Sequence, residues 1–467
     1  MLTRSACFHI HIFLRPKFII FFFTLFIFAG THAQIGIGTN TPDPSAILHV
    51  QDTARGFLIP RMTKLQKNAI QNPAEGLMVY QTDSPKGFWY FTNGNWRAMV
   101  PANYGFPIVI FDDDISNADA ATKAIEEVGP LTQEIRIQNC SNLTSLDLSM
   151  ATNLVELRIT DNAVLQNVNL GGLTQIQGGL YIESCPALTT ISAGALTKIG
   201  KALNDTYGLN VDFTGLTTLN FPVLKNVNGP IAIYLNSALT SINMPALVKH
   251  KDYNEQAYEF TISDNTALTS IILTSLNSTG ALEILRNRNL SSINLSSLAT
   301  ASGVVITNAT ALTSISFPAL VGPATVQLAA DSSLNNISFP VLANDGHVNL
   351  GNNPLMTNLN MPALVTGQTV FTGCSGLSGV SCPVLRSGSV YFYNTPALAT
   401  LSLPAFDTGS IYMPGPSLIT SLSLPAMRRM QYSNIAGNNS LTSISCPLLT
   451  QVDAAVINNN ANLASIT

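Results

Sequence analysis

The sequence of 467 residues predicts a mainly β protein, a parallel β-solenoid of about 14 coils that follows a small β-rich module. Three observations support the solenoid. The phrase ALTSISFPAL at Ala311–Leu320 recurs in variant forms over residues 143–467. Its leading apolar residue returns mostly every 21–23 residues, and in nine coils a proline follows the third apolar position. A fixed period of this length indicates coils that bury their apolar faces against their neighbours.

Each coil contains two predicted strands. In the example coil, Ile315, Ser316 and Phe317 alternate between apolar and polar, which is the period of a half-buried strand. Pro318 cannot donate a ladder hydrogen bond, so it ends this strand and turns the chain. A second strand precedes the phrase and places one outward residue between two inward apolar ones, as in Val304–Ile306.

The turn between the second strand and the phrase is rich in asparagine and cysteine. Asparagine or cysteine occupies this position at Cys140, Asn162, Cys185, Asn236, Asn265, Asn287, Asn353, Cys374, Asn438 and Asn460. A short amide side chain in a stack of turns can bond backbone groups of the coils on both sides. We therefore predict a structural ladder.

The cysteines are predicted to be small core residues. Cys140 and Cys185 share a phase but lie two coils apart, roughly 10 Å, and a disulfide requires Cα atoms within about 7 Å. The pair Cys382 and Cys446 is separated by three coils and is excluded in the same way.

The repeat resembles known solenoid families. The segment Leu154–Asn162 resembles a leucine-rich repeat, and the whole coil resembles the receptor L-domain solenoid. The bacterial 23-residue surface repeats are a second relative, but their aromatic-and-cysteine segment is missing. Because the resemblance is a pattern of apolar spacing, it implies a fold and says little about function.

Residues 1–33 have the pattern of a secretory signal peptide. Three basic residues, Arg4, Arg15 and Lys17, precede an apolar run, Phe18–Ala29, which is too short to span a bilayer comfortably, and Ala33 ends a small-x-small cleavage site. An uncleaved anchor is the alternative. We expect an exported protein, secreted or at the cell surface, with no transmembrane span after removal of the signal.

Residues 34–100 lack the repeat and are predicted to form a small β-rich module. Strands are expected at Ile47–Val50, Gly76–Tyr80 and Gly87–Phe91, with a tight turn at Asn93-Gly94. Thr63 and Gln66 form a capping box for a short helix.

The same module carries a second resemblance. The segments Gly36–Thr39, Gly56–Met62, Gly76–Tyr80 and Asn93–Trp96 resemble a module of secreted bacterial proteins that is similar to parts of phage tail fibres. The resemblance implies a stalk or an oligomerising head.

Residues 101–142 are predicted to cap the solenoid with a strand at Pro107–Phe111 and a helix at Asn117–Val128. The acidic triplet Asp112–Asp114 could suggest a metal site. Adjacent carboxylates before a helix more often supply turn and N-terminal charge, so we expect no metal.

Composition excludes several functions. The chain has 22 basic and 26 acidic residues, and removal of the signal raises the acidic excess to about seven, so nucleic acid is not an expected partner. No catalytic, phosphate-binding or zinc motif occurs, and the three histidines of the mature chain stand in different modules. Only four acidic residues follow residue 300, which argues against a β-helix polysaccharide enzyme. We expect no enzyme activity and no cofactor.

Two features suggest binding. Tyr391 and Tyr412 are outward residues of adjacent coils, so their side chains should stack and could bind a sugar or a protein; ordinary cross-strand packing is the alternative. Two coils are lengthened, at residues 198–208 and 249–259, and insertions in a solenoid become loops on one side. The second insertion carries the binding candidates Lys249, Lys251, Tyr253 and Tyr258, although a solvated loop without function is equally compatible.

The leading hypothesis is an exported or cell-surface interaction protein, an adhesin or ligand-binding solenoid with a protein or carbohydrate ligand. The alternatives are an architectural surface or appendage subunit and, third, a β-helix polysaccharide-acting enzyme. The sequence stops at Thr467 without a visible C-terminal cap. Either a downstream segment is missing or the open end docks, so oligomerisation is predicted through the N-terminal module or through that end.

Overall fold

The computed structural model describes residues 34–83, 86–99, 105–200, 208–250, 258–322 and 324–467. The chain divides into two units, residues 1–99 and residues 100–467. The predicted signal peptide, residues 1–33, lies outside the described residues. Neither described helix has the length and apolar character needed to cross a membrane.

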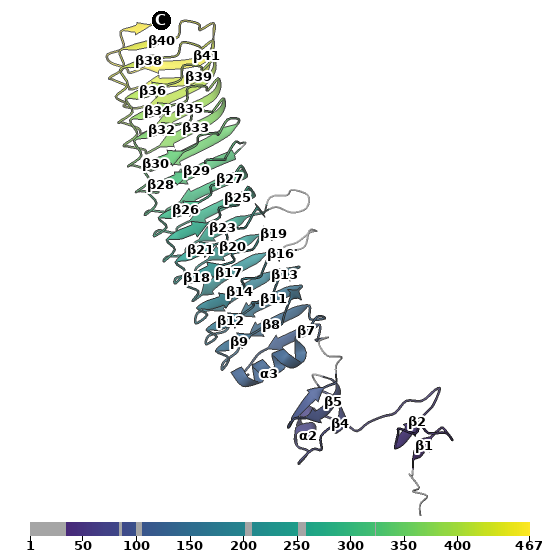
Figure 1. Ribbon diagram of the computed structural model, residues 1–467. Helices are drawn as coiled ribbons and strands as arrows, with labels where there is room; N and C mark the ends of the chain where they lie inside the picture. The colour runs from purple at the N-terminus through teal and green to yellow at the C-terminus, as the bar shows by residue number, and fades with distance from the viewer. Residues whose placement is uncertain (1–33, 84–85, 100–104, 201–207, 251–257, 323) are drawn as a thin grey trace, which may run out of the picture. The chain divides into compact units, whose positions relative to one another are not determined.

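The second unit is a parallel β-solenoid, which confirms the predicted fold class (Figure 1). One side of the coil is a parallel sheet of 21 strands in the described residues. Its main strands follow one another coil by coil. They are β7 (Ile108–Phe111), β8 (Glu134–Gln138), β11 (Glu156–Thr160), β14 (Leu180–Cys185), β17 (Leu209–Thr214), β20 (Ile231–Tyr234), β23 (Phe260–Ser263), β25 (Ser278–Leu285), β27 (Thr300–Thr307), β29 (Ala324–Ala329), β31 (Gly346–Gly351), β33 (Thr366–Thr372), β35 (Ser387–Tyr393), β37 (Thr408–Pro414), β39 (Arg429–Ala436) and β41 (Gln451–Asn458).

The early coils split this strand into two pieces. The short first pieces are β10 (Asn153–Leu154), β13 (Gln175–Ile176), β16 (Lys198–Ile199), β19 (Asn226–Val227) and β22 (Lys249–His250). At β25 the two pieces merge into one strand. Ser278 and Thr279 at its start pair with β22, and the residues from Leu282 onward pair with β23.

The opposite side of the coil carries three-residue strands that form several small parallel sheets. They are β9 (Ser145–Asp147), β12 (Asn167–Asn169), β15 (Thr190–Ser192), β18 (Thr218–Asn220), β21 (Ser241–Asn243), β24 (Ser270–Ile272), β26 (Ser292–Asn294), β28 (Ser314–Ser316), β30 (Asn336–Ser338), β32 (Asn358–Asn360), β34 (Gly379–Ser381), β36 (Thr400–Ser402), β38 (Ser421–Ser423), β40 (Ser443–Ser445) and the two-residue β42 (Ser465–Ile466).

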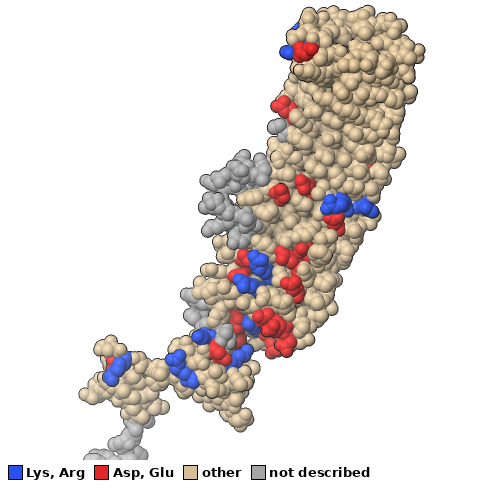
Figure 2. Space-filling view, turned by 180° about the vertical axis from the view of Figure 1, so that it is seen from behind, with Lys and Arg blue, Asp and Glu red and all other residues tan. Residues whose placement is uncertain are grey.

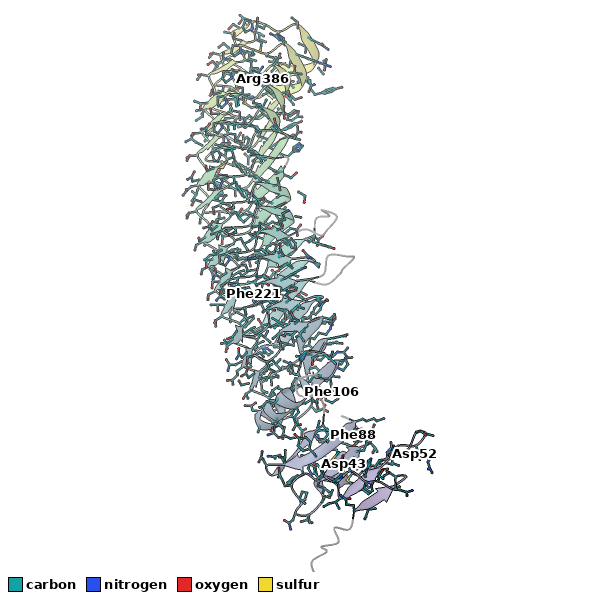
Figure 3. All side chains as sticks on the ribbon, turned by 45° about the vertical axis from the view of Figure 1, so that its right-hand side comes forward. Asp43, Asp52, Phe88, Phe106, Phe221 and Arg386 are labelled. Atoms are coloured by element: carbon teal, nitrogen blue, oxygen red, sulfur yellow. The ribbon has the colours of Figure 1, made fainter. Side chains whose placement is uncertain are left out.

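The core lies between the two sides and follows the predicted alternation. Ile315 and Phe317 are buried and Ser316 is exposed. Phe317 stacks on Phe339 of the next coil with ring centroids 5.2 Å apart and an interplanar angle of 3°. Phe221 is buried at the equivalent position of an earlier coil (Figure 3). Each such side chain contributes about 1.5–3 kcal/mol when fully buried, so stability is shared along the stack.

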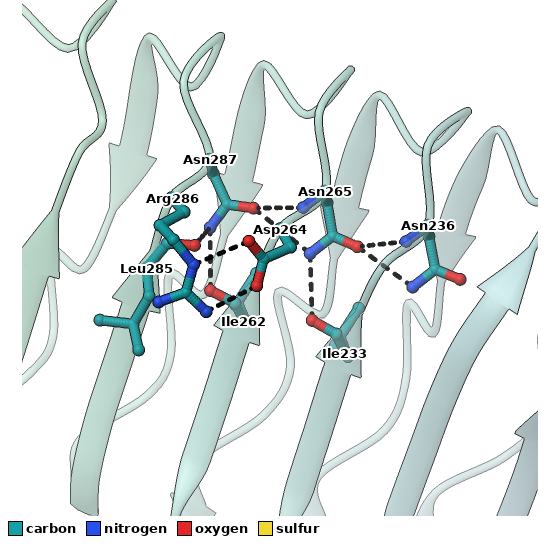
Figure 4. A network of polar contacts seen from close by, with 8 residues as sticks. All are labelled: Ile233, Asn236, Ile262, Asp264, Asn265, Leu285, Arg286 and Asn287. Atoms are coloured by element: carbon teal, nitrogen blue, oxygen red, sulfur yellow. Dashed lines mark hydrogen bonds and ion pairs between the residues drawn. The ribbon is translucent and has the colours of Figure 1, made fainter.

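The predicted asparagine ladder is present (Figure 4). The Oδ1 atom of Asn265 accepts the backbone N–H of Asn236 at 3.1 Å, and its Nδ2 donates to the carbonyl of Ile233 at 3.0 Å. The backbone N–H of Asn265 donates in turn to Oδ1 of Asn287 at 3.0 Å. Each amide therefore satisfies buried backbone groups of its neighbours, which would otherwise cost about 1–3 kcal/mol each. The five cysteines of the described residues are buried and free, as predicted.

The first coil is covered by helix α3 (Asn117–Glu127). Oδ1 of Asn117 accepts the backbone N–H groups of Thr144 at 2.8 Å and Ser145 at 3.3 Å. Its amide thus satisfies donors that a preceding coil would otherwise satisfy. The carbonyl of Asp113 accepts the N–H of Ser141 at 2.8 Å, so the acidic triplet serves the cap through its backbone. No group of metal-ligating side chains occurs in the residues that the structure describes.

The first unit contains two small sheets in its described residues. Strands β1 (Ile35–Ile37) and β2 (Leu48–Val50) form a parallel pair. Strands β3 (Arg61–Met62), β4 (Met78–Gln81), β5 (Gly87–Thr92) and β6 (Asn95–Ala98) form a second sheet, and α2 (Lys64–Asn68) begins at the predicted capping box. Asn93 and Gly94 have φ values of 51° and 78°, so they form the predicted tight turn between β5 and β6.

Candidate interaction surfaces

The β1–β2 pair presents an apolar face that nothing in the described chain covers. Ile35 lies beside Leu48, and Ile37 lies beside Val50, in register and on one side of the pair. Their exposed fractions are 57%, 48%, 55% and 41%. An isolated two-stranded sheet is marginally stable in water, and this one has no cover on its apolar side.

The second sheet of the first unit buries little apolar surface. Val79 and Trp89 are its only buried apolar side chains among the described residues. The Lys67 ammonium lies 3.3 Å from the centre of the Trp89 ring, a cation–π contact. Phe57 and Leu65 remain exposed in the same unit, as does Phe88, which is labelled in Figure 3. A single chain therefore supplies only a very small core for residues 34–99.

The outer face of the long sheet is charged in its first coils. Glu134 pairs with Arg136, and Glu156 pairs with Arg158 in the next coil. The Arg158 guanidinium lies 4.1 Å from the centre of the Tyr181 ring. Burial and the nearby Glu183 carboxylate raise the pKa of Asp212. Charges gather around these early coils and are sparse on the later ones in the face shown (Figure 2).

The outer face of the late coils carries tyrosines instead. Tyr391 and Tyr393 of β35 and Tyr412 of β37 form one cluster. The rings of Tyr391 and Tyr393 are parallel within 5°, with centroids 6.3 Å apart. The Tyr412 ring lies 5.9 Å from Tyr391 and 5.5 Å from Tyr393, inclined by 42° and 44°. Tyr391 and Tyr412 are in register as predicted, but they do not stack, because the ring of Tyr391 stacks on Tyr393 in the same strand.

The phenol hydroxyls of this cluster make no hydrogen bond to the described part of the protein. Within the described residues none of the three hydroxyls has a hydrogen-bond partner. Partial burial and the two neighbouring tyrosines raise the pKa of Tyr393. Each of the three hydroxyls can therefore donate a hydrogen bond to a ligand or accept one from it.

A β-bulge borders the cluster. The pairing of β37 with β39 shifts between Gly409 and Tyr412, so β39 has one extra residue there. The Ser433 hydroxyl accepts the backbone N–H of Ile411 at 3.1 Å, which replaces a ladder bond. Tyr432, next to the bulge, is 74% exposed. Bulges of this kind redirect side chains and occur often beside functional sites.

The second predicted binding region is only partly described. Lys249 is exposed at β22, and the Tyr258 ring lies 6.4 Å from the ring of His250. Lys251 and Tyr253 lie outside the described residues. His250 is buried, its Nε2 donates to the carbonyl of Gly229 at 2.7 Å, and burial lowers its pKa to about 4. This histidine is thus a neutral structural group, and Lys249 and Tyr258 lie several coils before the tyrosine cluster.

Comparison with known proteins gives one family match. Residues 36–116 match a family model described as a phage tail like trimerisation region. This range includes the described strands of the first unit except for Ile35 of β1, and it includes strand β7; the match agrees with the predicted resemblance to phage tail-fibre modules. No curated protein matches the chain.

Among solved structures, YopM from Yersinia enterocolitica WA-314 matches with 12% sequence identity and a TM-score of 0.17, over 76% of this chain and 91% of that chain. A likeness this weak carries no argument about this chain. The resemblance to receptor L-domains stays a prediction.

Sequence reasoning found part of the tyrosine cluster. It identified Tyr391 and Tyr412 from their phase but missed Tyr393, although a residue two positions after an outward strand residue faces the same way. It also missed the bulge beside Tyr412.

Proposed function

We propose that the protein is an exported surface or appendage protein in which the N-terminal region assembles three chains and the solenoid interacts with a protein or a glycan. The observation that carries the assembly is the uncovered face of Ile35, Ile37, Leu48 and Val50. Burying the remaining exposed surface of each of these side chains would stabilise an assembly by about 1 kcal/mol. A symmetric contact among copies would supply that cover.

The match to a phage tail like trimerisation region supports three as the number of chains. The small core of residues 34–99 supports the same proposal, since a unit that buries so little apolar surface gains stability from association. Export rests on the sequence pattern of residues 1–33, and the role of the solenoid is non-enzymatic in this proposal.

The assembly is tested by the mass in solution of residues 34–467. Multi-angle light scattering should give three times the chain mass. The double change Ile37→Asp and Val50→Asp should give monomers, because three pairs of carboxylates would be placed in one apolar contact. The matched control is Val341→Asp with Val384→Asp, two similarly exposed valines of the solenoid.

A wild-type monomer at micromolar concentration would refute the assembly. Loss of the trimer in the control pair would show that the solenoid makes the contact. Export is tested separately by fusing residues 1–40 to a periplasm-dependent reporter enzyme, and an inactive reporter would overturn it.

The second candidate function is an architectural one, in which the solenoid is only a spacer. The runs of ladder asparagines, such as Asn236, Asn265 and Asn287, and the stacked phenylalanines favour it, because they recur along the solenoid without regard to any site. A solenoid that binds no ligand in the experiment below, on a chain that still forms trimers, would support the architectural role.

A further inference from the structure

We propose that Tyr391, Tyr393 and Tyr412 form a binding site for an uncharged carbohydrate. This inference rests on the proposed function, since it names the ligand class of the solenoid. The cluster is the one place on the described outer face where three aromatic rings meet. Nothing in the solenoid requires them there, because the inward residues of the same strands, Val390 and Phe392, already form the core.

The ring geometry suits a sugar ring. The rings of Tyr391 and Tyr393 are parallel and the Tyr412 ring is inclined against both by 42° and 44°, so the cluster presents apolar ring surface at more than one angle. The axial hydrogens of a pyranose form an apolar face that packs on an aromatic ring. The hydroxyl groups around its edge then lie near the level of the phenol oxygens.

Hydrogen-bonding capacity at the site is unused. The three phenol hydroxyls have no partner within the described residues. Asn434, which pairs with Tyr412 across the strands, has an Oδ1 atom that is covered and without a partner in the same part of the chain. A buried acceptor without a partner is costly, and a sugar hydroxyl that donates to it would offset that cost after a small shift of the Tyr412 ring.

The electrostatic surroundings favour an uncharged ligand. Strands β33, β35 and β37 contain no charged side chain. The charged residues near these strands lie at their other end: Arg386 precedes β35, Arg428 pairs with Asp407 at 3.7 Å, and Arg429 pairs with Asp453 at 2.8 Å. An acidic polysaccharide would therefore find no counter-charge in the strands that carry the rings, whereas a neutral glycan needs none.

A protein partner fits the surroundings less well. Two of the residues in register with the cluster are polar, Thr372 beside Tyr393 and Asn434 beside Tyr412, and Val370 beside Tyr391 is the one apolar neighbour among these three. A stable protein interface requires a larger apolar centre around its aromatic anchors. A peptide ligand is therefore an alternative outcome of the test.

The test uses residues 34–467 and titration calorimetry with hexasaccharides of β-1,4-glucan, β-1,3-glucan, xylan, mannan and α-1,4-glucan, and with hexagalacturonate as an acidic probe. At least one neutral hexasaccharide should bind, and hexagalacturonate should not. Tyr391→Ala with Tyr412→Ala should weaken that binding about ten-fold or more, the effect of losing about 1.4 kcal/mol of ring contact. Tyr393→Ala should show a similar loss.

Two further variants separate binding from folding. Phenylalanine at all three positions keeps the rings, so it should retain part of the affinity and the wild-type melting curve. Tyr234→Ala removes another outward tyrosine of the same sheet, in β20, and should leave binding unchanged.

Failure to bind any neutral hexasaccharide would overturn the inference, as would equal affinity of the alanine variants and the wild type. Selection of peptide ligands alone from a random peptide library, lost in the same variants, would replace the carbohydrate by a protein partner. The light-scattering mass keeps the two proposals apart. A trimer that binds no sugar refutes only this inference, and a monomer that binds sugar refutes only the assembly.

Discussion

Asp331→Asn should stabilise the solenoid at and above neutral pH. Asp331 occupies the ladder position that asparagine fills in many other coils, and it is fully buried. One carboxyl oxygen accepts the backbone N–H of Ala309 at 2.7 Å. The other, Oδ2, has no partner within the described residues, whereas Nδ2 of Asn353 in the next coil donates to the carbonyl of Leu328 at 2.9 Å. An asparagine at 331 would restore that donor.

The magnitude follows from the titration of the carboxyl group. Burial raises the pKa of Asp331 to about 7 from an ordinary value of 3.8. The pKa of Asp331 is higher in the folded state than in the unfolded state. The protonated carboxyl group therefore makes its full contribution to the free energy of unfolding below pH 3.8, and this contribution is lost between about pH 4 and pH 7. At about 1.36 kcal/mol for each unit, the loss approaches 4 kcal/mol above pH 7, and asparagine adds about 1 kcal/mol for the new hydrogen bond.

Thermal melts followed by circular dichroism at pH 3.5, 5.5 and 8 test this expectation. The wild type should lose stability across the series, and the Asp331→Asn variant should lose less and melt higher at pH 8. Hydrogen exchange should show the gain in the coils from β27 to β31, since stability in a repeat protein is local. The control is Asp345→Asn, which changes an exposed acid in the adjacent coil. Parallel melting curves for wild type and Asp331→Asn at all three pH values would refute the reasoning.

Further substitutions test the ladder, the phase of the core and the cap. Asn265→Ala should lower the free energy of unfolding by about 2–3 kcal/mol, because it leaves the Asn236 N–H and the Ile233 carbonyl without a partner. A melting temperature equal to that of the wild type would show that the ladder asparagines do not stabilise the fold. Ile315→Asp should unfold several coils by burying a charge, whereas Ser316→Asp on the exposed face should cost less than about 0.5 kcal/mol, and comparable losses would show that the phase is wrong. Asn117→Ala should raise hydrogen exchange at Thr144 and Ser145 while later coils keep their protection, and unchanged exchange there would remove this side chain from the cap.

The repeat could be predicted because the same requirement returns in every coil. Ile315 and Phe317 face one continuous core, and the asparagines at the ladder position bond equivalent backbone groups in their coils, so the period, the strands and the buried turn all follow from the sequence. The first unit is different. Its capping box and its Asn93-Gly94 turn are local signals and were predicted, but the uncovered face of β1 and β2 depends on which strands pair. A short apolar strand does not reveal by itself whether its own chain or another copy covers it.

The tyrosine cluster shows the same limit at the level of single residues. Phase alone places Tyr391 and Tyr412 outward in adjacent coils, and it also places Tyr393 there. The inclination of the rings depends on which neighbour each ring meets, which a repeat pattern does not encode. The bulge had a weak signal, since the repeat lengthens from 21 to 22 residues after Ile419. An extra residue can lie in a turn or in a strand, and only the pairing of β37 with β39 places it beside Tyr412.

Assembly and sugar binding make a joint prediction if both proposals hold. A shallow site of three partly exposed rings should bind a single oligosaccharide weakly, because little of the ligand is enclosed. Three sites on one assembly would act together on a polymer, since the second and third contacts form at a high effective concentration. The Ile37→Asp and Val50→Asp variant should therefore bind a hexasaccharide with wild-type affinity but be retained on the corresponding insoluble polysaccharide at least ten-fold less. Column retention and calorimetry on the same preparations measure the two effects. Equal retention of monomer and trimer would show that assembly serves another purpose than avidity.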